Sequence, residues 1–133
     1  MSGALVLDSE GLAKAVRRDP EVHEWLTAAR GADLPVVTSA AVLVEVIHPK
    51  INDAALKWTL SRLRVEPVTQ ALAQSAADLL RDAGLHGHKY AIDAMLCATA
   101  LAQPGGRVTI LTSDVEDVEM LMVKHRRVVA EKV

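Results

Sequence analysis

The chain has 133 residues, of which 50% are apolar and 24% are charged. This length and balance indicate one domain, spanning residues 1–133, that can bury a hydrophobic core, and they exclude a disordered or collagen-like chain. The formal net charge of −2 argues against the basic surface of a typical nucleic-acid-binding domain. An acidic metal site would make the count negative and still leave basic residues elsewhere to meet phosphates.

The cysteine content and the hydropathy of the sequence indicate in which cellular compartment the protein is expected. The single cysteine, Cys97, excludes an intramolecular disulfide and suits a reducing environment, and its apolar neighbours indicate a buried position. No uncharged apolar stretch approaches the roughly 18 residues that a membrane span needs. The apolar run near the N-terminus lacks the positively charged flank of a signal peptide. We therefore expect a cytoplasmic protein without a membrane partner.

Short apolar runs alternate with segments of helical periodicity along the whole chain. In chain order we expect a strand at 3–8, helices at 9–18 and 20–31, a strand at 35–38, helices at 40–47 and 52–63, a strand at 64–68, a helix at 69–83, a polar loop at 85–89, a helix at 90–102, a turn at 103–106, a strand at 107–112, a helix at 114–124 and a strand at 127–130. This alternation predicts an α/β fold with a mainly parallel, twisted sheet of about four to five short strands flanked by helices.

Small polar residues mark the expected helix starts. Asp8 or Ser9 precedes the first helix, Ser39 precedes the third, and Thr69 precedes the long amphipathic one. Such side chains accept hydrogen bonds from free N–H groups of the first helical turn. Gly84 is placed to end the long helix.

Four carboxylates occupy positions that suggest a site. Asp8 and Asp114 follow expected strands, and sites in open parallel sheets form beyond the carboxyl ends of strands. Glu45 and Asp93 interrupt nearly all-apolar helical runs that contain no lysine or arginine. A buried carboxylate is costly unless it is paired or bound to metal. We therefore expect all four to meet around a divalent cation, since without one their repulsion would raise their pKa values.

The order of these acids resembles that of the PIN-domain family and, within it, of the VapC toxins of bacterial toxin–antitoxin pairs. The resemblance covers the whole chain and rests on Leu5-Val6-Leu7-Asp8-Ser9, on 39–46 with Glu45, on Ile92-Asp93-Ala94-Met95-Leu96-Cys97-Ala98, and on Leu111-Thr112-Ser113-Asp114-Val115-Glu116-Asp117. It implies a three-layer PIN-like sandwich. The site residues that it implies are an acidic tetrad of Asp8, Glu45, Asp93 and Asp114, an additional acid at Asp117, and at Thr112 a hydroxyl that orients ligands or a metal-bound water.

The resemblance also implies an activity and partners. These are endonucleolytic cleavage of RNA, control by a VapB-like antitoxin, and a homodimer. Oxygen ligands favour Mg²⁺ or Mn²⁺ over Zn²⁺, and such an ion lowers the pKa of a bound water and polarises the scissile phosphate, while a second ion would stabilise the leaving oxygen. Asp8, Asp93 and Asp114 are expected as metal ligands, directly or through water. Glu45 is expected as a ligand or as the general base.

Structural alternatives stand beside these roles. Asp8 alone could be a helix cap, and Asp114, Glu116, Asp117 and Glu119 could form an acidic first turn that complements the helix dipole. Functional alternatives are a catalytically inactive PIN-fold module that binds RNA or protein, a phosphorelay receiver, and a haloacid-dehalogenase-type phosphatase. A receiver would carry its acids at strand ends and a lysine at the end of a late strand, and the 107–112 strand has none. The phosphatase would need aspartate where Glu10 lies.

Basic and aromatic residues give weaker signals. His86 and His88 lack further nitrogen or sulfur ligands nearby, so with Lys89 they are expected to face RNA phosphate or solvent. Two basic clusters, at 17–18 and 124–127, are expected to be solvated and could contact phosphate or an acidic antitoxin tail. Aromatic residues are too few for a base-stacking platform. The two tryptophans are expected to be core or interface anchors, and they are Trp25 and Trp58.

Overall fold

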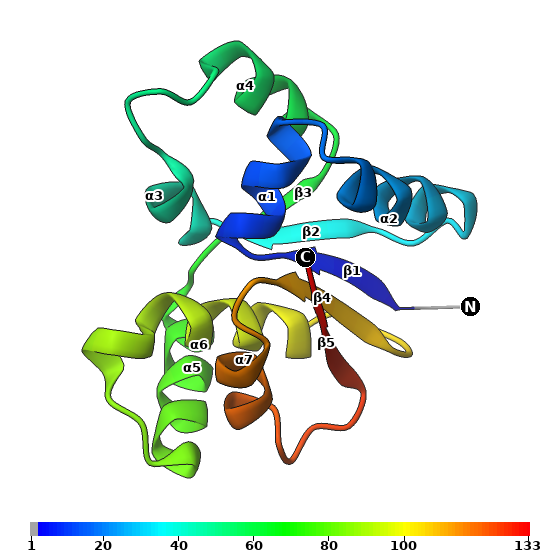
Figure 1. Cartoon of the computed structure of the whole chain (residues 1–133). Helices are drawn as coiled ribbons and strands as arrows, with labels where there is room; N and C mark the ends of the chain where they lie inside the picture. Colours follow the sequence, from blue (N-terminus) through cyan, green and yellow to red (C-terminus); the bar gives the residue numbers. More distant parts are fainter. Residues whose placement is uncertain (1–2) are drawn as a thin grey trace.

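A five-stranded sheet forms the centre of the computed structural model, which describes residues 3–133 (Figure 1). The strands are β1 (Ala4–Leu7), β2 (Val36–Ser39), β3 (Arg64–Glu66), β4 (Val108–Thr112) and β5 (Val128–Lys132). All neighbouring strands run parallel, in the order β3-β2-β1-β4-β5. The chain thus builds outward from β1 in one direction and then crosses to its other side. This reversal creates a topological switch point between β1 and β4.

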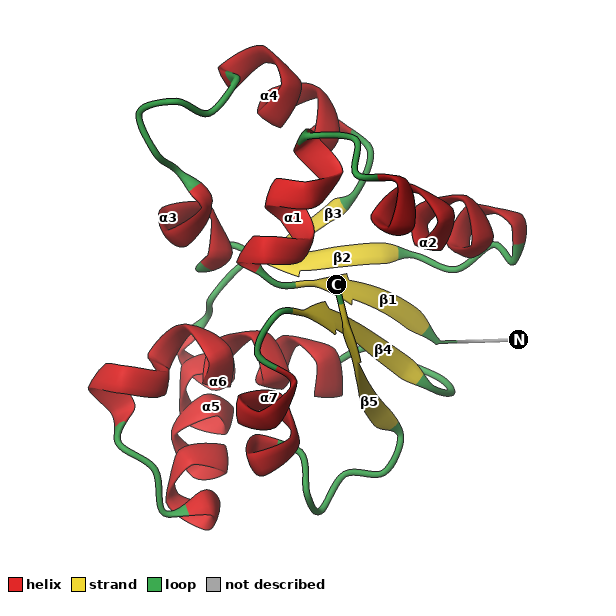
Figure 2. Cartoon of the chain, in the orientation of Figure 1, coloured by secondary structure: helices red, strands yellow, loops and turns green. Residues whose placement is uncertain are grey.

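Helices cover both faces of the sheet and complete a three-layer sandwich, as predicted (Figure 2). One layer contains α1 (Ser9–Val16), α2 (Pro20–Gly31), α3 (Val42–Val46) and α4 (Asp53–Ser61). The other contains α5 (Gln70–Ala83), α6 (Gly87–Leu101) and α7 (Val115–Leu121). Within residues 3–133 no helix combines the length and the apolar character that crossing a membrane would require.

The central strands are apolar on both faces because helices cover both. Every residue of β1 is buried, and Ile110 and Leu111 of β4 are fully inaccessible to solvent. Such continuous apolar runs are typical of parallel strands. Cys97 is buried in α6 as expected, and burial, followed by the charge of Asp93, raises the pKa of its thiol to about 12. The thiol therefore stays protonated and acts as core packing.

Helix starts follow the predicted capping chemistry in most places. The side chains of Asp8, Asp19, Asn52 and Thr69 each accept a hydrogen bond from a backbone N–H in the first turn that follows. Gly84 ends α5 with a positive φ of 68°. Ser39 differs from its prediction, because α3 begins only at Val42, and the Ser39 hydroxyl accepts instead from the N–H of Ala41 in the preceding turn.

Several element boundaries also differ from the prediction, most of all in the C-terminal half of the chain. The expected loop at 85–89 is wrong from residue 87 onward, since α6 begins at Gly87 and kinks at Tyr90, where φ is −112° and ψ is 16°. The first turn of an exposed helix can consist of polar residues, so the polar composition of residues 85–89 did not distinguish the start of a helix from a loop. Helix α7 stops at Leu121 rather than residue 124, and β5 continues to Lys132.

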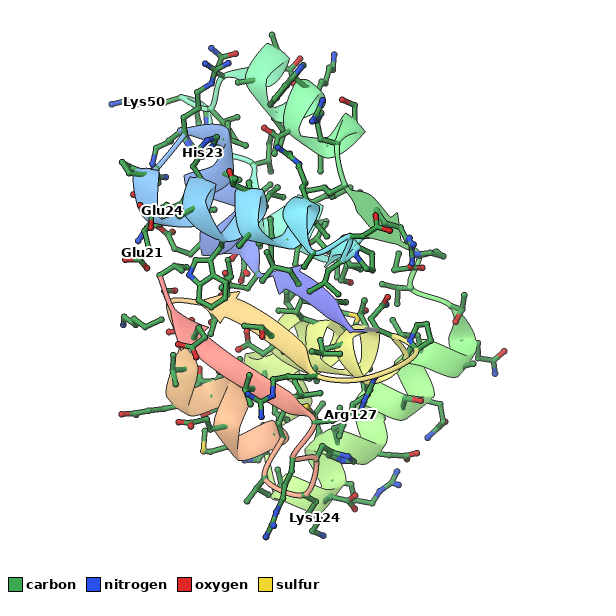
Figure 3. The ribbon with its side chains drawn as sticks, turned by 90° about the vertical axis from the view of Figure 1, so that its right-hand side faces the viewer. Glu21, His23, Glu24, Lys50, Lys124 and Arg127 are labelled. Atoms are coloured by element: carbon green, nitrogen blue, oxygen red, sulfur yellow. The ribbon has the colours of Figure 1, made fainter. Side chains whose placement is uncertain are left out.

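One arginine ties the end of α6 to the loop that leads into β4. The guanidinium of Arg127, labelled in Figure 3, donates hydrogen bonds to the backbone carbonyls of Leu101, Gln103, Gly105 and Gly106. Carbonyls at a helix C-terminus lack partners within the helix, so this fan of donors satisfies groups that would otherwise depend on water.

Candidate active site

Two acids lie next to the topological switch point. Asp8 directly follows β1, and Asp114 follows β4 after one intervening residue. The two strands are hydrogen-bonded neighbours with Leu7 paired to Leu111, so their carboxyl ends reach the same edge of the sheet. Crevices at such switch points are the usual binding sites of open parallel sheets.

Asp8 is held in place by the first turn of α1. Its side chain is only 6% exposed, and its Oδ1 accepts a 2.7 Å hydrogen bond from the N–H of Gly11. A Cβ on Gly11 would lie 3.0 Å from the carbonyl oxygen of Leu111, so glycine permits this close approach of helix and strand. Asp8 therefore is a helix cap, as the structural alternative proposed, and its charge also acts on Asp93.

Burial is the largest influence on Asp8 and raises the pKa of its carboxyl. Hydrogen bonds from the Gly11 N–H, the Thr112 hydroxyl and the Ser113 N–H lower the pKa in part, and the charge of Asp114 raises it further. The charged carboxylate is thus costly here even with three donors.

Thr112 connects the two strand-end acids. It is fully buried, and its hydroxyl oxygen accepts a 2.8 Å hydrogen bond from the backbone N–H of Asp114. Its single hydroxyl hydrogen remains available for the Asp8 carboxylate. Asp114 itself is exposed at the start of α7, and its side chain makes no capping hydrogen bond there. Glu116 and Asp117 lie in the first turn of α7, where the helix-dipole alternative places them.

The prediction that Glu45 is buried in an apolar helix is wrong. Helix α3 has only five residues and lies at the surface, where Glu45 is exposed beside Val44 and Ile47, which are 75% and 55% exposed. A short helix turns only part of its apolar surface to the core, here through Val42 and Val46. Desolvation therefore cannot be the reason that Glu45 needs a partner.

Glu45 nevertheless joins the other acids. Its Oε1 accepts a 2.6 Å hydrogen bond from the hydroxyl of Ser9, the residue after Asp8. Its charge also acts on Asp93, as described next. The structure therefore brings Glu45 close enough to Asp93 for their charges to interact, although the argument that Glu45 is buried fails.

Asp93 is the acid around which the charges converge. It lies half-buried on α6, and its pKa is raised to about 6. Burial is the largest cause, followed by the charges of Asp117, Glu45, Asp114 and Asp8. These five residues, which we call the carboxylate cluster, come from four separate parts of the chain. The burial argument that failed for Glu45 holds for Asp93.

Within residues 3–133 no salt bridge involves any member of the carboxylate cluster. In the same part of the chain, no three histidine, cysteine, aspartate or glutamate side chains are already arranged to hold a metal ion together. The chemistry of the donors is uniform, since all five are hard carboxylate oxygens that suit Mg²⁺ or Mn²⁺. Burial is the main cause of the raised pKa of Asp93, and the repulsion by the other four acids, which a cation would relieve, adds to it.

Two residues near the cluster were not predicted. Ser9 positions Glu45, and Lys132 at the end of β5 donates a 2.9 Å hydrogen bond from Nζ to the carbonyl oxygen of Ser113. Lys132 is opposite Thr112 in the strand register, so it reaches the loop that carries Asp114. The apolar run at 128–130 marks the last strand, and extending that strand by two residues would have included Lys132. A single hydrogen bond from a hydroxyl, such as that of Ser9 to Glu45, produces no periodic pattern in the sequence.

The remaining candidates lie around the surface. His86 and His88 are exposed at the start of α6 with ring centroids 5.8 Å apart, and the Lys89 ammonium lies 5.1 Å from the centroid of the Tyr90 ring. Trp58 was expected to be either a core or an interface anchor. Its side chain is 55% exposed, so the prediction of a core position is wrong.

Comparisons with known proteins agree on the fold. A PIN domain family model matches residues 5–116. A chain from the VapBC2 structure of Rickettsia felis, bound to promoter DNA, is 16% identical, with a TM-score of 0.67 and 98% of each chain covered. A chain from a Klebsiella pneumoniae toxin–antitoxin complex is 19% identical, with a TM-score of 0.67 over 98% of this chain and 100% of that one.

A third similar chain comes from FitAB bound to a DNA fragment, with 20% identity, a TM-score of 0.63, and coverage of 96% of this chain and 94% of that one. None of the curated proteins matches the sequence. At these identities the solved structures support the fold, and the family model supports membership.

Proposed function

Since the chain belongs to the PIN domain family, we propose that it is a metal-dependent endoribonuclease whose active site is the carboxylate cluster. The observation that carries the proposal is the surroundings of Asp93. Burial and, after it, the charges of four further carboxylates raise its pKa, and no described basic side chain forms a salt bridge with any of the five. If these carboxylates had only a structural role, basic side chains would be expected to pair with them. A cation site instead requires carboxylates that form no salt bridge with a basic side chain.

Each acid has a proposed role. Asp8, Asp93 and Asp114 would hold Mg²⁺ or Mn²⁺, directly or through water, and Asp117 would be an additional ligand. When bound, the ion supplies a Lewis acid that activates water and polarises the scissile phosphate. The Thr112 hydroxyl bonds to both the Asp8 side chain and the Asp114 main chain, and so fixes their relative position.

The proton of the attacking water needs an acceptor among the same residues. Glu45 is exposed and is oriented by the Ser9 hydroxyl, so its carboxylate is accessible to a water molecule from the solvent. We propose Glu45 as either this base or a further ligand.

We further propose that the protein is the toxin of a VapBC-type pair, acting on RNA in the cytoplasm as a homodimer. The supporting observations are the toxin–antitoxin complexes that contain chains of similar fold. Val44 and Ile47 also expose apolar surface beside Glu45, where an antitoxin could cover the cluster. This surface favours a protein partner over free solvent exposure.

One observation favours a second candidate, a PIN-fold module that binds RNA or protein without cleaving. No three-ligand arrangement is already formed within the described residues 3–133. In this alternative the carboxylate cluster holds no cation. Its negative charge would then repel RNA phosphate, whereas a bound metal ion would attract it.

The experiment that separates the two uses purified protein and cellular RNA with Mg²⁺, Mn²⁺ or EDTA. Asp93→Asn and Asp114→Asn are expected to lose cleavage by about 100-fold or more, as for loss of a catalytic group. Glu119→Gln, an exposed acid on α7 outside the cluster, is the matched control and is expected to keep activity. Absence of metal-dependent cleavage, together with unchanged toxicity of the two variants in cells, would exclude the nuclease.

A further inference from the structure

A cavity of about 250 Å³ lies at the end of α1 opposite to Asp8. It opens between the end of α1, the helices α2 and α4, and the start of β2. Helix α1 has eight residues and so is about 12 Å long, which separates this cavity from the carboxylate cluster. Figure 3 labels His23, which lines the cavity from α2.

The cavity wall is strongly basic. Arg18, Arg30 and Arg62 all line it, together with His23, and we call it the arginine pocket. The single acid in its wall, Asp19, is already used to accept a hydrogen bond from the N–H of Val22.

Among the described residues, none of the three arginines forms a salt bridge, whereas Arg17, Arg64 and Arg81 each pair with a carboxylate. Three guanidinium groups without a carboxylate partner repel one another, and this repulsion is relieved when an anion binds among them.

Arg18 occupies a position that does not favour its residue type. Its φ is 59°, in the left-handed region where glycine or asparagine usually ends a helix. The N–H of Arg18 bonds to the carbonyl of Ala15, and that of Asp19 to the carbonyl of Lys14, which is the hydrogen-bond pattern that glycine normally serves. An arginine here points to a use for its side chain.

The Arg18 guanidinium lies over the Trp58 ring, with its Cζ 5.9 Å from the ring centroid, and Arg62 lies over the same ring at 5.4 Å. Stacking on an indole restricts a guanidinium without using its hydrogen-bond donors. Two of the three arginines are therefore positioned before any ligand arrives. Apolar side chains, including Leu26 and Leu63, form most of the rest of the wall.

We propose that the arginine pocket binds a phosphate monoester. Each guanidinium presents a planar fork of donors that matches two oxygens of a phosphate. A monoester dianion has three terminal oxygens for three such forks, whereas a carboxylate has two oxygens and one charge. The small volume admits a phosphate with little more than a sugar or base attached. The phosphate belongs either to a free mononucleotide or to the 5′ end of an RNA.

The test is isothermal titration calorimetry of the whole protein in EDTA, with inorganic phosphate, adenosine 5′-monophosphate and acetate as probes. Arg18→Gly removes the guanidinium and suits the positive φ, so folding should be preserved. Arg62→Ala removes the second stacked arginine. Both are expected to weaken phosphate binding at least tenfold. Arg17→Ala removes the same charge one residue away, outside the pocket, and is expected to change affinity less than twofold.

Several results would overturn the proposal. These are no saturable phosphate binding at millimolar concentration, equal weakening by Arg17→Ala, or acetate binding as tightly as phosphate. A 5′-phosphorylated oligoribonucleotide that binds more tightly than both its 5′-hydroxyl form and the free nucleotide would support an RNA end as the source. Equal binding of the two oligonucleotides, weaker than that of the nucleotide, would support a free mononucleotide. The proposal does not depend on cleavage, so Asp93→Asn should bind phosphate normally.

Discussion

Replacing Asp93 by asparagine tests the electrostatics of the carboxylate cluster directly. Folding raises the pKa of Asp93 from 3.8 to about 6, which means that the folded state disfavours its charge. At about 1.4 kcal/mol per pKa unit this corresponds to about 3 kcal/mol. The side chain is only half-buried, so solvent screening reduces the expected cost to about 1–2 kcal/mol.

The sign of this effect follows from proton linkage. The unfolded chain ionises Asp93 near pH 3.8 and the folded chain only near about pH 6, so the cost is absent below the first value and complete above the second. Stability is therefore lost as pH rises through this window. Asp93→Asn cannot ionise, and in EDTA it should be more stable than the unmodified protein by about 1–2 kcal/mol at about pH 7.5, and by about a third of that near pH 4.5.

Urea denaturation followed by circular dichroism at both pH values measures the difference. Glu119→Gln, which removes an exposed carboxylate from α7, serves as the control for net charge and should show little dependence on pH. Millimolar Mg²⁺ should stabilise the unmodified protein more than Asp93→Asn, because only the former keeps the complete donor set. If Asp93→Asn is less stable than the unmodified protein at neutral pH without metal, the cost that we attribute to the burial of Asp93 and to the charges around it does not exist.

Three further substitutions test individual contacts. All three are measured by urea denaturation, and the third is also assayed for RNA cleavage. Gly11→Ala should destabilise the fold by about 1–3 kcal/mol, because its Cβ would meet the Leu111 carbonyl oxygen at 3.0 Å, and unchanged stability would contradict the close approach. Arg127→Lys keeps the charge but loses the planar fan of donors to four carbonyls, with an expected loss of about 1–3 kcal/mol; a loss under about 0.5 kcal/mol would show that water replaces it. Ser9→Ala should lower cleavage about tenfold by freeing Glu45, with less than about 1 kcal/mol of destabilisation, and full activity would remove Glu45 from the mechanism.

The α/β architecture could be predicted because local signals agree along the chain. Capping side chains such as Asp8 and Thr69 marked helix starts correctly, and all five strands lie close to where they were expected. The strand order β3-β2-β1-β4-β5 could not be predicted from these signals, since pairing joins residues far apart in sequence. Boundaries failed where polar residues form an exposed helical turn, as at Gly87.

The site was predicted by two kinds of reasoning with different outcomes. For Asp93, an acid in an apolar helix indicated a buried carboxylate, and the structure agrees in its half-burial and raised pKa. For Glu45, the same reasoning failed, because apolar neighbours such as Val44 can face solvent or a partner as well as a core. Sequence periodicity shows which residues share a helix face but not what covers that face.

The pairing of β1 with β4 has a consequence for the newly made chain on the ribosome. Strand β1 is synthesised first, yet its neighbour β4 begins only at Val108. Before then Asp8 lacks the Thr112 hydroxyl and Ser113 N–H, and Asp93 lacks the charges of the acids on and before α7. The carboxylate cluster can therefore assemble only late in translation, and a nascent chain shorter than this carries no complete acidic site.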